Sequence, residues 1–316
     1  MKKLAHPLLP GHSDLLESGW AVFALACVIT FMSGCSNLAY RSIADGLASS
    51  GGVYASDDDV ELVGAATPFG LKTMEGVLVH IPEHKGLALA VTSGFVQYAY
   101  VFIQMPAEEM EDRDVAAAYA QKARAMRMYI RARDYGLHAL GLSKPGSLQR
   151  LREDPATVLS STSQADVGLL YYTGLAWAAA ISLGKDTPAL VADLPIADAL
   201  IARAAALDPD YDVGGLHSFL IGYVMNRPNR GKDAEITSRH HFERAVELSA
   251  GKRVAPYVAL AESVAVETRN RREYEMLLQC ALAIDPGARP EWRLANIVMQ
   301  RRARWLLART DTLFAE

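Results

Sequence analysis

The chain has 316 residues and a formal net charge of −4, with 32 Lys and Arg against 36 Asp and Glu. Hydrophobic residues make up 51% of the sequence, which argues against a disordered chain because so much apolar material can form a core. The balanced charge argues against a dedicated nucleic-acid-binding protein, which normally carries a basic excess. Alanine, the strongest helix former, occurs 50 times. The composition predicts a helical globular protein of one or two domains.

Residues 1–34 have the pattern of a lipoprotein signal peptide. Two early lysines and a polar stretch precede the uncharged run WAVFALACVITFM, which is shorter than the roughly 20 residues that a membrane span needs. The tetrapeptide Met-Ser-Gly-Cys that follows resembles the bacterial lipobox. We therefore predict that Cys35 is lipidated and that its acyl chains are the only membrane attachment. Ser36 indicates the outer membrane, by resemblance to Gram-negative lipoproteins.

The remaining cysteines agree with this interpretation. Cys27 would leave with the signal peptide, so the mature chain would keep Cys280 as its one unmodified thiol. A single thiol cannot form an internal disulfide, and stability must come from a packed core. Because Cys280 lies in an apolar helical pattern, we expect it to be a small core residue.

The next segments, in chain order, are expected to be helical. Residues 35–56 are predicted to be a lipidated tether and a first short helix, and residues 57–316 an all-helical domain. The acidic run 57–59 precedes an apolar pattern, which favours a helix cap over a calcium site because the EF-hand spacing is absent. Pro68 is expected to divide the following run into two helices or to kink it, and Pro82 to end it.

Three longer helices are predicted further along. Residues 87–105 are strongly apolar and aromatic, which indicates a buried helix, and residues 164–184 show the same character. Residues 112–142 form a long helix whose expected apolar face is Val115, Tyr119, Met126, Ile130 and Leu137. The same helix carries Lys122, Arg124, Arg127, Arg131 and Arg133. These basic side chains are expected to be solvated or ion-paired, with an anion-attracting wall as the alternative. No segment alternates as a strand does, so we predict no sheet.

A spaced pattern recurs three times in the second half. Its copies are Ala197-x3-Ile201-x2-Ala204-x4-Pro209, Ser238-x3-Phe242-x2-Ala245-x4-Ala250 and Tyr274-x3-Leu278-x2-Ala281-x4-Pro286. Small residues let two helices approach, and proline ends the helix. The pattern resembles the second helix of a tetratricopeptide repeat, although the copies are 41 and 36 residues apart. We predict stacked helical hairpins, a cryptic repeat array in one solenoid-like body.

Two short patterns match catalytic or metal-binding motifs, and each has a better non-catalytic explanation. Ser182 and Lys185 match the S-x-x-K pattern of penicillin-recognising enzymes, but no SDN or KTG partner is present. His240, Glu243 and Glu247 have metal-ligand spacing on one helix face, and a solvated face explains them better. We predict no catalytic residues, no metal site and no cofactor. The arginines at 301, 302, 304 and 309 are expected to serve solubility and salt bridges between subunits, with a docking patch for an acidic partner as the alternative.

Several stretches together resemble a known family. They are ASSGGVY at 48–54, ATP at 66–68, GFVQYAY at 94–100, RARDY at 131–135, HFERAVEL at 241–248 and LAN at 294–296. Their order along one lipoprotein resembles TatT, the tetratricopeptide-repeat lipoprotein associated with TRAP transporters. The resemblance implies an all-helical homotrimer in the periplasm that binds the solute-binding subunit of a TRAP transporter. It also implies a channel or cavity through which a hydrophobic ligand or an organic acid passes.

Candidate cavity residues were sought among side chains with an apolar body and a polar tip. These are Tyr98, Tyr171, Tyr172, Trp177 and His217, and the alternative for each is an ordinary core position. The function that the sequence favours is a docking and ligand-handover module of a TRAP system. The alternatives are a scaffold lipoprotein in envelope assembly that holds peptides, and a hydrolase that uses Ser182.

Overall fold

The computed structural model describes residues 38–228 and 230–315, and within these ranges the chain is helical and contains no strand. The predicted signal peptide and Cys35 lie outside the described residues. The described part of the first helix covers 38–49. The helices of the first half are α2 (Gly51–Ala55), α3 (Val60–His80), α4 (Lys85–Ala99), α5 (Met105–Met110), α6 (Val115–Ala139), α7 (Ser147–Glu153), α8 (Pro155–Leu159) and α9 (Val167–Leu183).

The second half continues in the same way. Its helices are α10 (Pro188–Val191), α11 (Leu194–Leu207), α12 (Tyr211–Met225), α13 (Ala234–Leu248), α14 (Ala255–Leu260), α15 (Arg271–Ala283), α16 (Arg293–Ala308) and α17 (Thr310–Leu313). Two π-helical turns, η1 (Tyr100–Gln104) and η3 (Ala261–Ala265), and two 3-10 turns, η2 (Gln164–Asp166) and η4 (Pro290–Trp292), complete the described part. The all-helical prediction is confirmed.

Helix caps explain several of the boundaries. The carboxylate of Asp59 accepts a hydrogen bond from the amide of Leu62 at 2.9 Å and begins α3, which confirms a capping role for the acidic run. Pro82 follows the end of α3, as predicted. Pro68 does not divide this helix: α3 continues through it as one element, so the prediction of two helices is wrong. The amide that Pro68 lacks would have bonded the carbonyl of Gly64.

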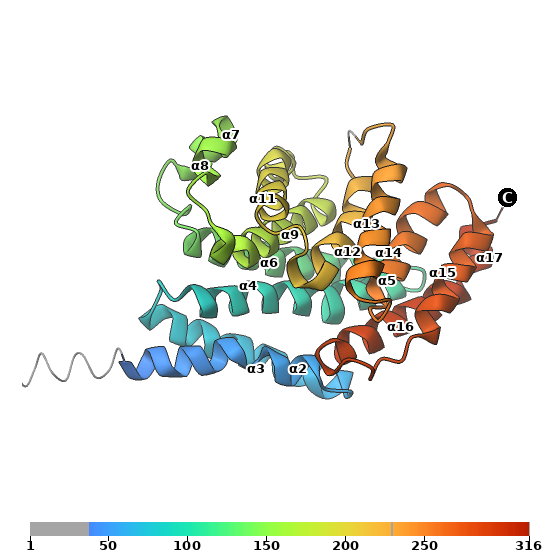
Figure 1. Ribbon diagram of the computed structural model, residues 1–316, viewed down its shortest axis with the longest axis horizontal. Coiled ribbons are helices and arrows are strands. Elements are labelled where there is room, and N and C mark those ends of the chain that lie inside the picture. Colours follow the sequence, from blue (N-terminus) through green and yellow to red (C-terminus); the bar gives the residue numbers. More distant parts are fainter. Residues whose placement is uncertain (1–37, 229, 316) are drawn as a thin grey trace, which may run out of the picture.

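Successive helices pack beside one another in a layered body (Figure 1). The first helix and α3 form a bottom layer, α4 crosses above them, and α6, α9 and α11 lie above α4. The segments Lys85–Met110 and Gln164–Leu183 are long and apolar enough to span a bilayer by length and composition. Core helices meet the same criterion, and 67% of the second segment's apolar window is buried inside the protein.

Small residues set the contacts between α6, α9 and α11. On α6 the buried positions are Ala118, Ala125, Tyr129, Ala132, Gly136 and Leu137. The expected apolar face of this helix was partly wrong, because Val115 and Tyr119 are 68% and 67% exposed. Alanine and glycine add little to the hydrophobic periodicity of a helix. The prediction relied on the larger apolar residues of this helix and therefore chose the wrong face in part. Cys280 is likewise exposed on α15, which corrects its assignment to the core.

The apolar interior is divided into two main cores. One joins buried side chains between Ala44 and Leu220, and the other joins those between Ile221 and Leu306. A small third cluster of Val60, Met105 and Val298 lies between them. Two helices connect the halves: α16 contributes Val298 to this cluster and Ala303 and Leu306 to the second core. α12 contributes Leu216 and Leu220 to the first core and Ile221 and Met225 to the second.

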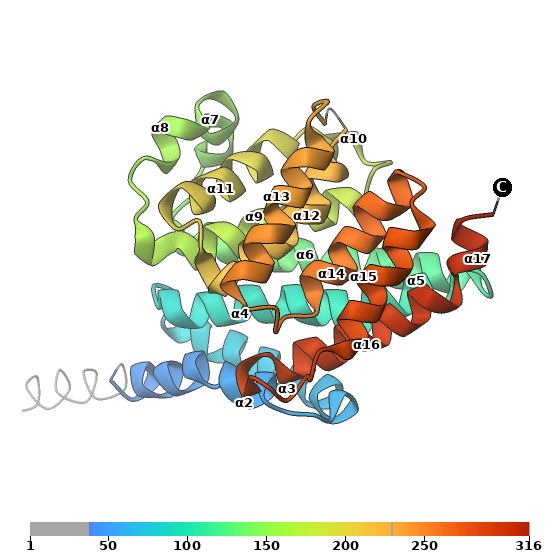
Figure 2. The same cartoon turned by 45° about the vertical axis from the view of Figure 1, so that its right-hand side comes forward.

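Figure 2 shows α16 running from beside α3 toward the region of α5. Ion pairs fasten this helix to the first half of the chain, because Arg301 pairs with Glu61 of α3 and Arg309 pairs with Asp112 just after α5. Between them, Arg302 is buried, with its Nη2 atom 2.8 Å from Glu108 and its Nε atom 2.9 Å from Glu262. All three arginines therefore have carboxylate partners within the same chain, and the salt bridges between subunits and the docking patch stay predictions.

Arg302→Met tests this fastening. The substitution leaves the carboxylates of Glu108 and Glu262 close together without their cation, and we expect it to lower the free energy of unfolding by about 3 kcal/mol. Arg304→Met is the matched control, because Arg304 is exposed on the same helix and has no ion pair among the described residues. Urea denaturation measures both. Equal, small losses for the two variants would contradict the assignment.

Gly136→Ala tests the close approach of α6 and α9. A Cβ at this position would overlap Oγ1 of the buried Thr173 and lie 3.0 Å from its Cβ. Overpacking should outweigh the roughly 1 kcal/mol that alanine contributes in helix propensity, with a net loss of about 1–2 kcal/mol. Gly76→Ala on α3 is the control, since nothing lies within 4 Å of its added Cβ, and thermal unfolding should show stabilisation.

Candidate functional site

A cluster of tyrosines lies where the first half of the chain meets the second. The rings of Tyr171 and Tyr172 on α9 are 4.8 Å apart, and the ring of Tyr211 at the start of α12 lies 5.7 Å from Tyr171. Phe219 of α12 closes the group at 5.8 Å from Tyr171. We call Tyr171, Tyr172 and Tyr211 the tyrosine cluster. The structure thus brings two of the five predicted cavity residues together.

An arginine from the second half stands beside the tyrosine cluster. Arg253, just before α14, donates hydrogen bonds from Nη1 and Nη2 to the two carboxylate oxygens of Asp212 at 3.0 and 2.8 Å. Its guanidinium also lies 4.6 Å from the ring centroid of Trp292 in η4. The Nε atom of Arg253 is buried and has no hydrogen-bond partner among the described residues. Sequence reasoning missed this pair, because its members are 41 positions apart.

The backbone that carries Asp212 is strained. Asp212, Val213 and Gly214 have φ values of 54°, 50° and 88°, in the left-handed region that favours glycine. For a β-branched residue such as Val213 this conformation is an outlier that the surrounding structure must enforce. Gly214 is required here because a Cβ would lie 3.1 Å from the backbone of Ala245 on α13. The strain places Asp212 toward Arg253 and turns the chain into α12.

Burial keeps the phenols of the cluster neutral. It is the main cause that raises the pKa values of Tyr171, Tyr172 and Tyr211, and the nearby Asp212 carboxylate raises them further. The Tyr171 side chain is almost fully buried. The cluster therefore offers neutral hydroxyl groups set among aromatic rings.

The other predicted cavity residues have different surroundings. Tyr98 on α4 lies 5.7 Å from the ring of Phe102, and Trp177 is completely buried on α9 beneath the guanidinium of Arg133. His217 on α12 contacts His241 on α13, with their Nδ1 atoms 2.8 Å apart. Whether any of the five lines a cavity stays a prediction, because the two pockets described next have other linings.

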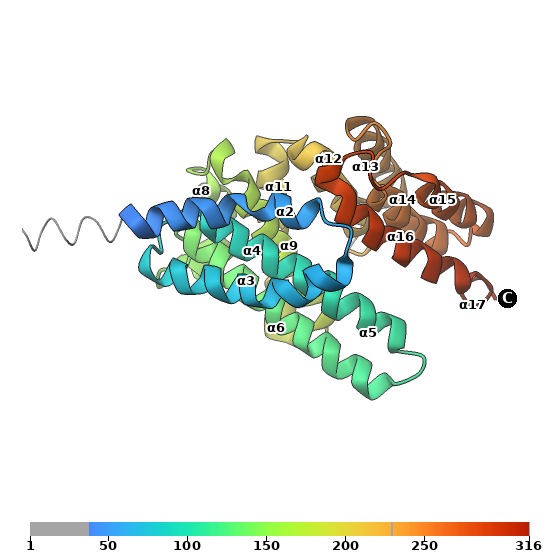
Figure 3. The same ribbon diagram turned by 90° about the horizontal axis from the view of Figure 1, so that it is seen from below.

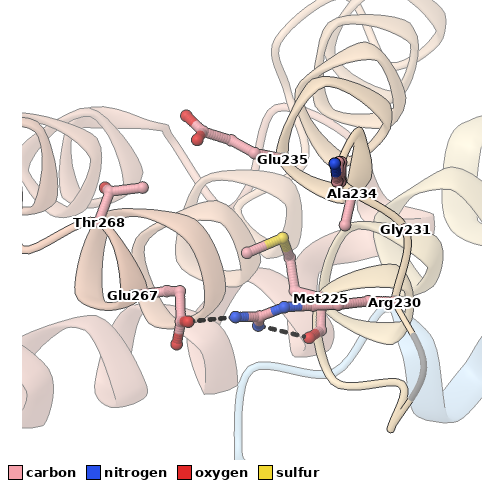
Figure 4. Close-up of a pocket in the computed structure, with 8 residues that line it drawn as sticks. Met225, Arg230, Gly231, Ala234, Glu235, Glu267 and Thr268 are labelled. Atoms are coloured by element: carbon pink, nitrogen blue, oxygen red, sulfur yellow. Dashed lines mark hydrogen bonds and ion pairs between the residues drawn. The ribbon is translucent and has the colours of Figure 1, made fainter.

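The first pocket has a volume of about 340 Å³ and lies between the α12–α13 connection and the end of η3 (Figure 4). Arg230 crosses it, pairs with Glu267 and donates to the carbonyl of Met225 at 3.0 Å. The second pocket, of about 210 Å³, lies at the start of α4 beside His84. Both are open, charged surface features.

The other candidate sites find structural explanations. Three of the five predicted basic side chains of α6 are ion-paired, as in Lys122 with Glu111 and Arg131 with the buried Glu75. The Ser182 hydroxyl donates to the carbonyl of Ala179 in its own helix at 2.8 Å. Among the described residues, no group of three or more His, Cys, Asp or Glu side chains could hold a metal ion.

His217 and His241, which we call the histidine pair, form a hydrogen bond between α12 and α13. The ring centroids are 5.0 Å apart while the Nδ1 atoms are 2.8 Å apart, so the two nitrogens point at each other. A shared metal would need them to point at a common third position. Burial and the nearby His217 and His240 lower the pKa of His241 to about 4. Burial lowers the pKa of His217 as well, with Asp210 raising it and Arg244 lowering it.

Comparison with known proteins adds independent information. Residues 56–314 match the TAtT family, which is described as the TRAP transporter T-component. An uncharacterized protein of Treponema pallidum (strain Nichols) is 30% identical over 272 residues, covering 84% of this chain and 83% of that protein.

Stability should fall with acid because of the histidine pair. The imidazole of His241 binds a proton near pH 6.5 in the unfolded chain but only near pH 4 in the folded protein. The contribution of this difference to the free energy of unfolding is therefore fully present above pH 6.5 and is lost as the pH falls toward 4. In the His241→Gln variant, we expect the free energy of unfolding to fall by about 2 kcal/mol less than in the native protein as the pH is lowered from 7 to 4, a value reduced for solvent screening.

Urea denaturation between pH 7 and pH 4 measures the effect. His138→Gln, on the exposed end of α6, is the control and should leave the slope unchanged. A slope in the His241→Gln variant as steep as that of the native protein would exclude the pair as its source.

Proposed function

Because the chain belongs to the TRAP transporter T-component family, we propose that it docks the solute-binding subunit of its transport system and assists ligand passage. The observation that carries this proposal is the family match, which extends over residues 56–314 and hence over nearly all of the described fold. The family is an accessory transport component, and the coarse role follows from membership. The docking partner, the route of the ligand and the assembly are the proposed parts.

Lipid attachment in the periplasm is part of the proposal. The apolar run at 20–32 and the lipobox-like Met-Ser-Gly-Cys support cleavage before Cys35 and acylation of its thiol. Ser36 supports delivery to the outer membrane. An anchored protein would remain beside its transporter while its helical body stays in the aqueous space.

We further propose that the second half is built from tetratricopeptide-like hairpins. The small residues of the repeated pattern, Ala197, Ala204, Ala245 and Ala281, are all fully buried. The helices that carry them pack against neighbours in the order of the chain, α11 on α9, α13 on α12 and α15 on α14. Stacked hairpins of this kind present an extended surface on which a folded partner can dock.

The tyrosine cluster is the proposed contact for a passing ligand. It combines aromatic surface with hydroxyls that are held neutral, which suits an apolar molecule or an organic acid that carries oxygen acceptors. Tyr98, Trp177 and His217 are proposed to line the same route, with less support from their contacts. No catalytic step is proposed, and a homotrimer is retained from the family resemblance.

Binding of the solute-binding subunit tests the function. The purified mature protein should bind the solute-binding subunit encoded with its TRAP permease, with a dissociation constant in the micromolar range that suits a transient partner. Isothermal titration calorimetry measures this affinity. An unrelated periplasmic binding protein is the control. Binding of extended peptides in place of the subunit would contradict docking and favour an envelope scaffold.

Lipidation is tested separately in cells. Native protein should incorporate labelled palmitate and fractionate with membranes, whereas Cys35→Ser should remain soluble and unlabelled. Cys280→Ser is the control and should retain the label, because its exposed thiol lies in the helical body.

A further inference from the structure

The outermost layer of the fold carries most of the exposed apolar side chains. Figure 3 shows the first helix, α2 and α3 nearest the viewer, below α4. In the described residues, eleven large apolar side chains are exposed, and six of them lie between positions 38 and 79. These six are Leu38, Ile43, Val53, Leu62, Phe69 and Val79. Phe69 is the most exposed of all, at 78%. A concentration of this kind marks an interaction surface.

Most outward positions of these helices are uncharged, with Asp45 of the first helix as the exception. On α3 the buried residues Val63, Leu71 and Leu78 face the body, and helical spacing places the exposed residues opposite them. We define the lower face by the outward residues of the first helix, α2 and α3. They are Leu38, Ser42, Gly46, Ser49, Val53, Leu62, Ala65, Ala66, Phe69, Thr73 and Gly76, and all are exposed.

The charged side chains of the same helices form ion pairs with neighbouring residues. Arg41 lies 3.3 Å from Glu83, and Asp45 lies 2.9 Å from His84, both at the start of α4. On α3, Glu61 pairs with Arg301 of α16, and Lys72 lies 2.7 Å from the buried Glu75. Each of these charged side chains has an ion-pair partner, and those of Asp45, Glu61 and Lys72 remain 75%, 72% and 66% exposed.

The two helices form a flat pair. The ring of Tyr40 stacks on that of His80 at 4.4 Å, near the end of α3. At the opposite end, the Tyr54 hydroxyl lies 3.0 Å from the position that a Cβ on Gly70 would occupy. The first helix and α3 therefore lie antiparallel and side by side, and both axes run along the lower face. This is the orientation of helices that rest in a membrane interface.

The sequence distance from Cys35 to the first described residue identifies the occupant of this surface. The described part of the first helix starts at residue 38, three positions after Cys35. Three residues span at most about 10 Å even when extended. A lipid on Cys35 would therefore hold the start of the helix within about 10 Å of the bilayer, with Leu38 closest.

We propose that the lower face rests on the lipid surface, with Leu38, Val53, Leu62 and Phe69 at the boundary between headgroups and acyl chains. The proposal deepens the proposed function and rests on its lipid anchor at Cys35. The contact is apolar, so it needs no anionic lipid and is insensitive to salt. It fixes the orientation of the body, because the hairpins α11–α13 lie on the side away from the lower face, as Figure 1 shows.

Photo-crosslinking tests the orientation without depending on cellular lipidation. The mature chain with Cys280→Ser is coupled through the Cys35 thiol to a maleimide lipid in phosphatidylcholine vesicles. The photoreactive residue p-benzoylphenylalanine replaces Phe69 on the lower face, or Ile236 on α13 as the control, which is 69% exposed. Mass spectrometry then measures phospholipid attached at each position.

Position 69 should capture phospholipid about tenfold more than position 236, with the same yield in low and high salt. Equal lipid yields at the two positions would overturn the proposal. Capture of a second copy of the chain at position 69 would also overturn it, and would identify the lower face as a subunit interface. Because the lipid is attached chemically, failure here is distinct from failure of natural lipidation.

A second variant keeps the test independent of the probe's own apolar character. With p-benzoylphenylalanine at position 62, Phe69→Glu should reduce lipid capture several-fold, because a carboxylate would enter the interface. Ile236→Glu should leave it unchanged. Circular dichroism on the same samples verifies folding, and an unchanged yield in Phe69→Glu would contradict the proposed contact.

Discussion

The attachment of α16 to both halves of the chain is the interaction on which the architecture depends. Each half has its own apolar core, and α12 contributes buried side chains to both of them. Arg302 bridges that division by facing Glu108 from one half and Glu262 from the other. A buried cation between two carboxylates contributes less to net stability than to specificity, since other relative placements of the halves would leave charges unpaired. The tyrosine cluster depends on this placement.

The tyrosine cluster lies in the first core, beside an arginine of the second half. Tyr171 and Tyr172 come from α9, while Arg253 comes from the second half and reaches Asp212 at the strained start of α12. A change in the relative position of the halves would alter the contact between Arg253 and Asp212 before it altered either core. This location suits a site that a docking partner influences, because partners act on interfaces more readily than on packed interiors.

Much of the fold could be predicted from local signals. The helix from 164 to 184, the cap before α3 and its end near Pro82 all follow from short-range chemistry that the sequence displays directly. The buried face of α6 and the exposure of Cys280 could not be predicted, because alanine and glycine contacts leave no strong periodicity. Tyr171 and Tyr172 were selected by their chemistry. Arg253 was missed because its partner is distant in sequence and its recognition depends on the strained backbone at Val213.

We propose that a lipid-anchored helical body presents its hairpins to the solute-binding subunit while its opposite face lies toward the membrane. Hydrogen–deuterium exchange of the mature protein on vesicles, with and without the subunit, tests this arrangement directly. We expect the subunit to slow exchange within residues 194–248 and to leave exchange of residues 38–80 unchanged. Slower exchange confined to residues 38–80, or no change anywhere, would contradict it.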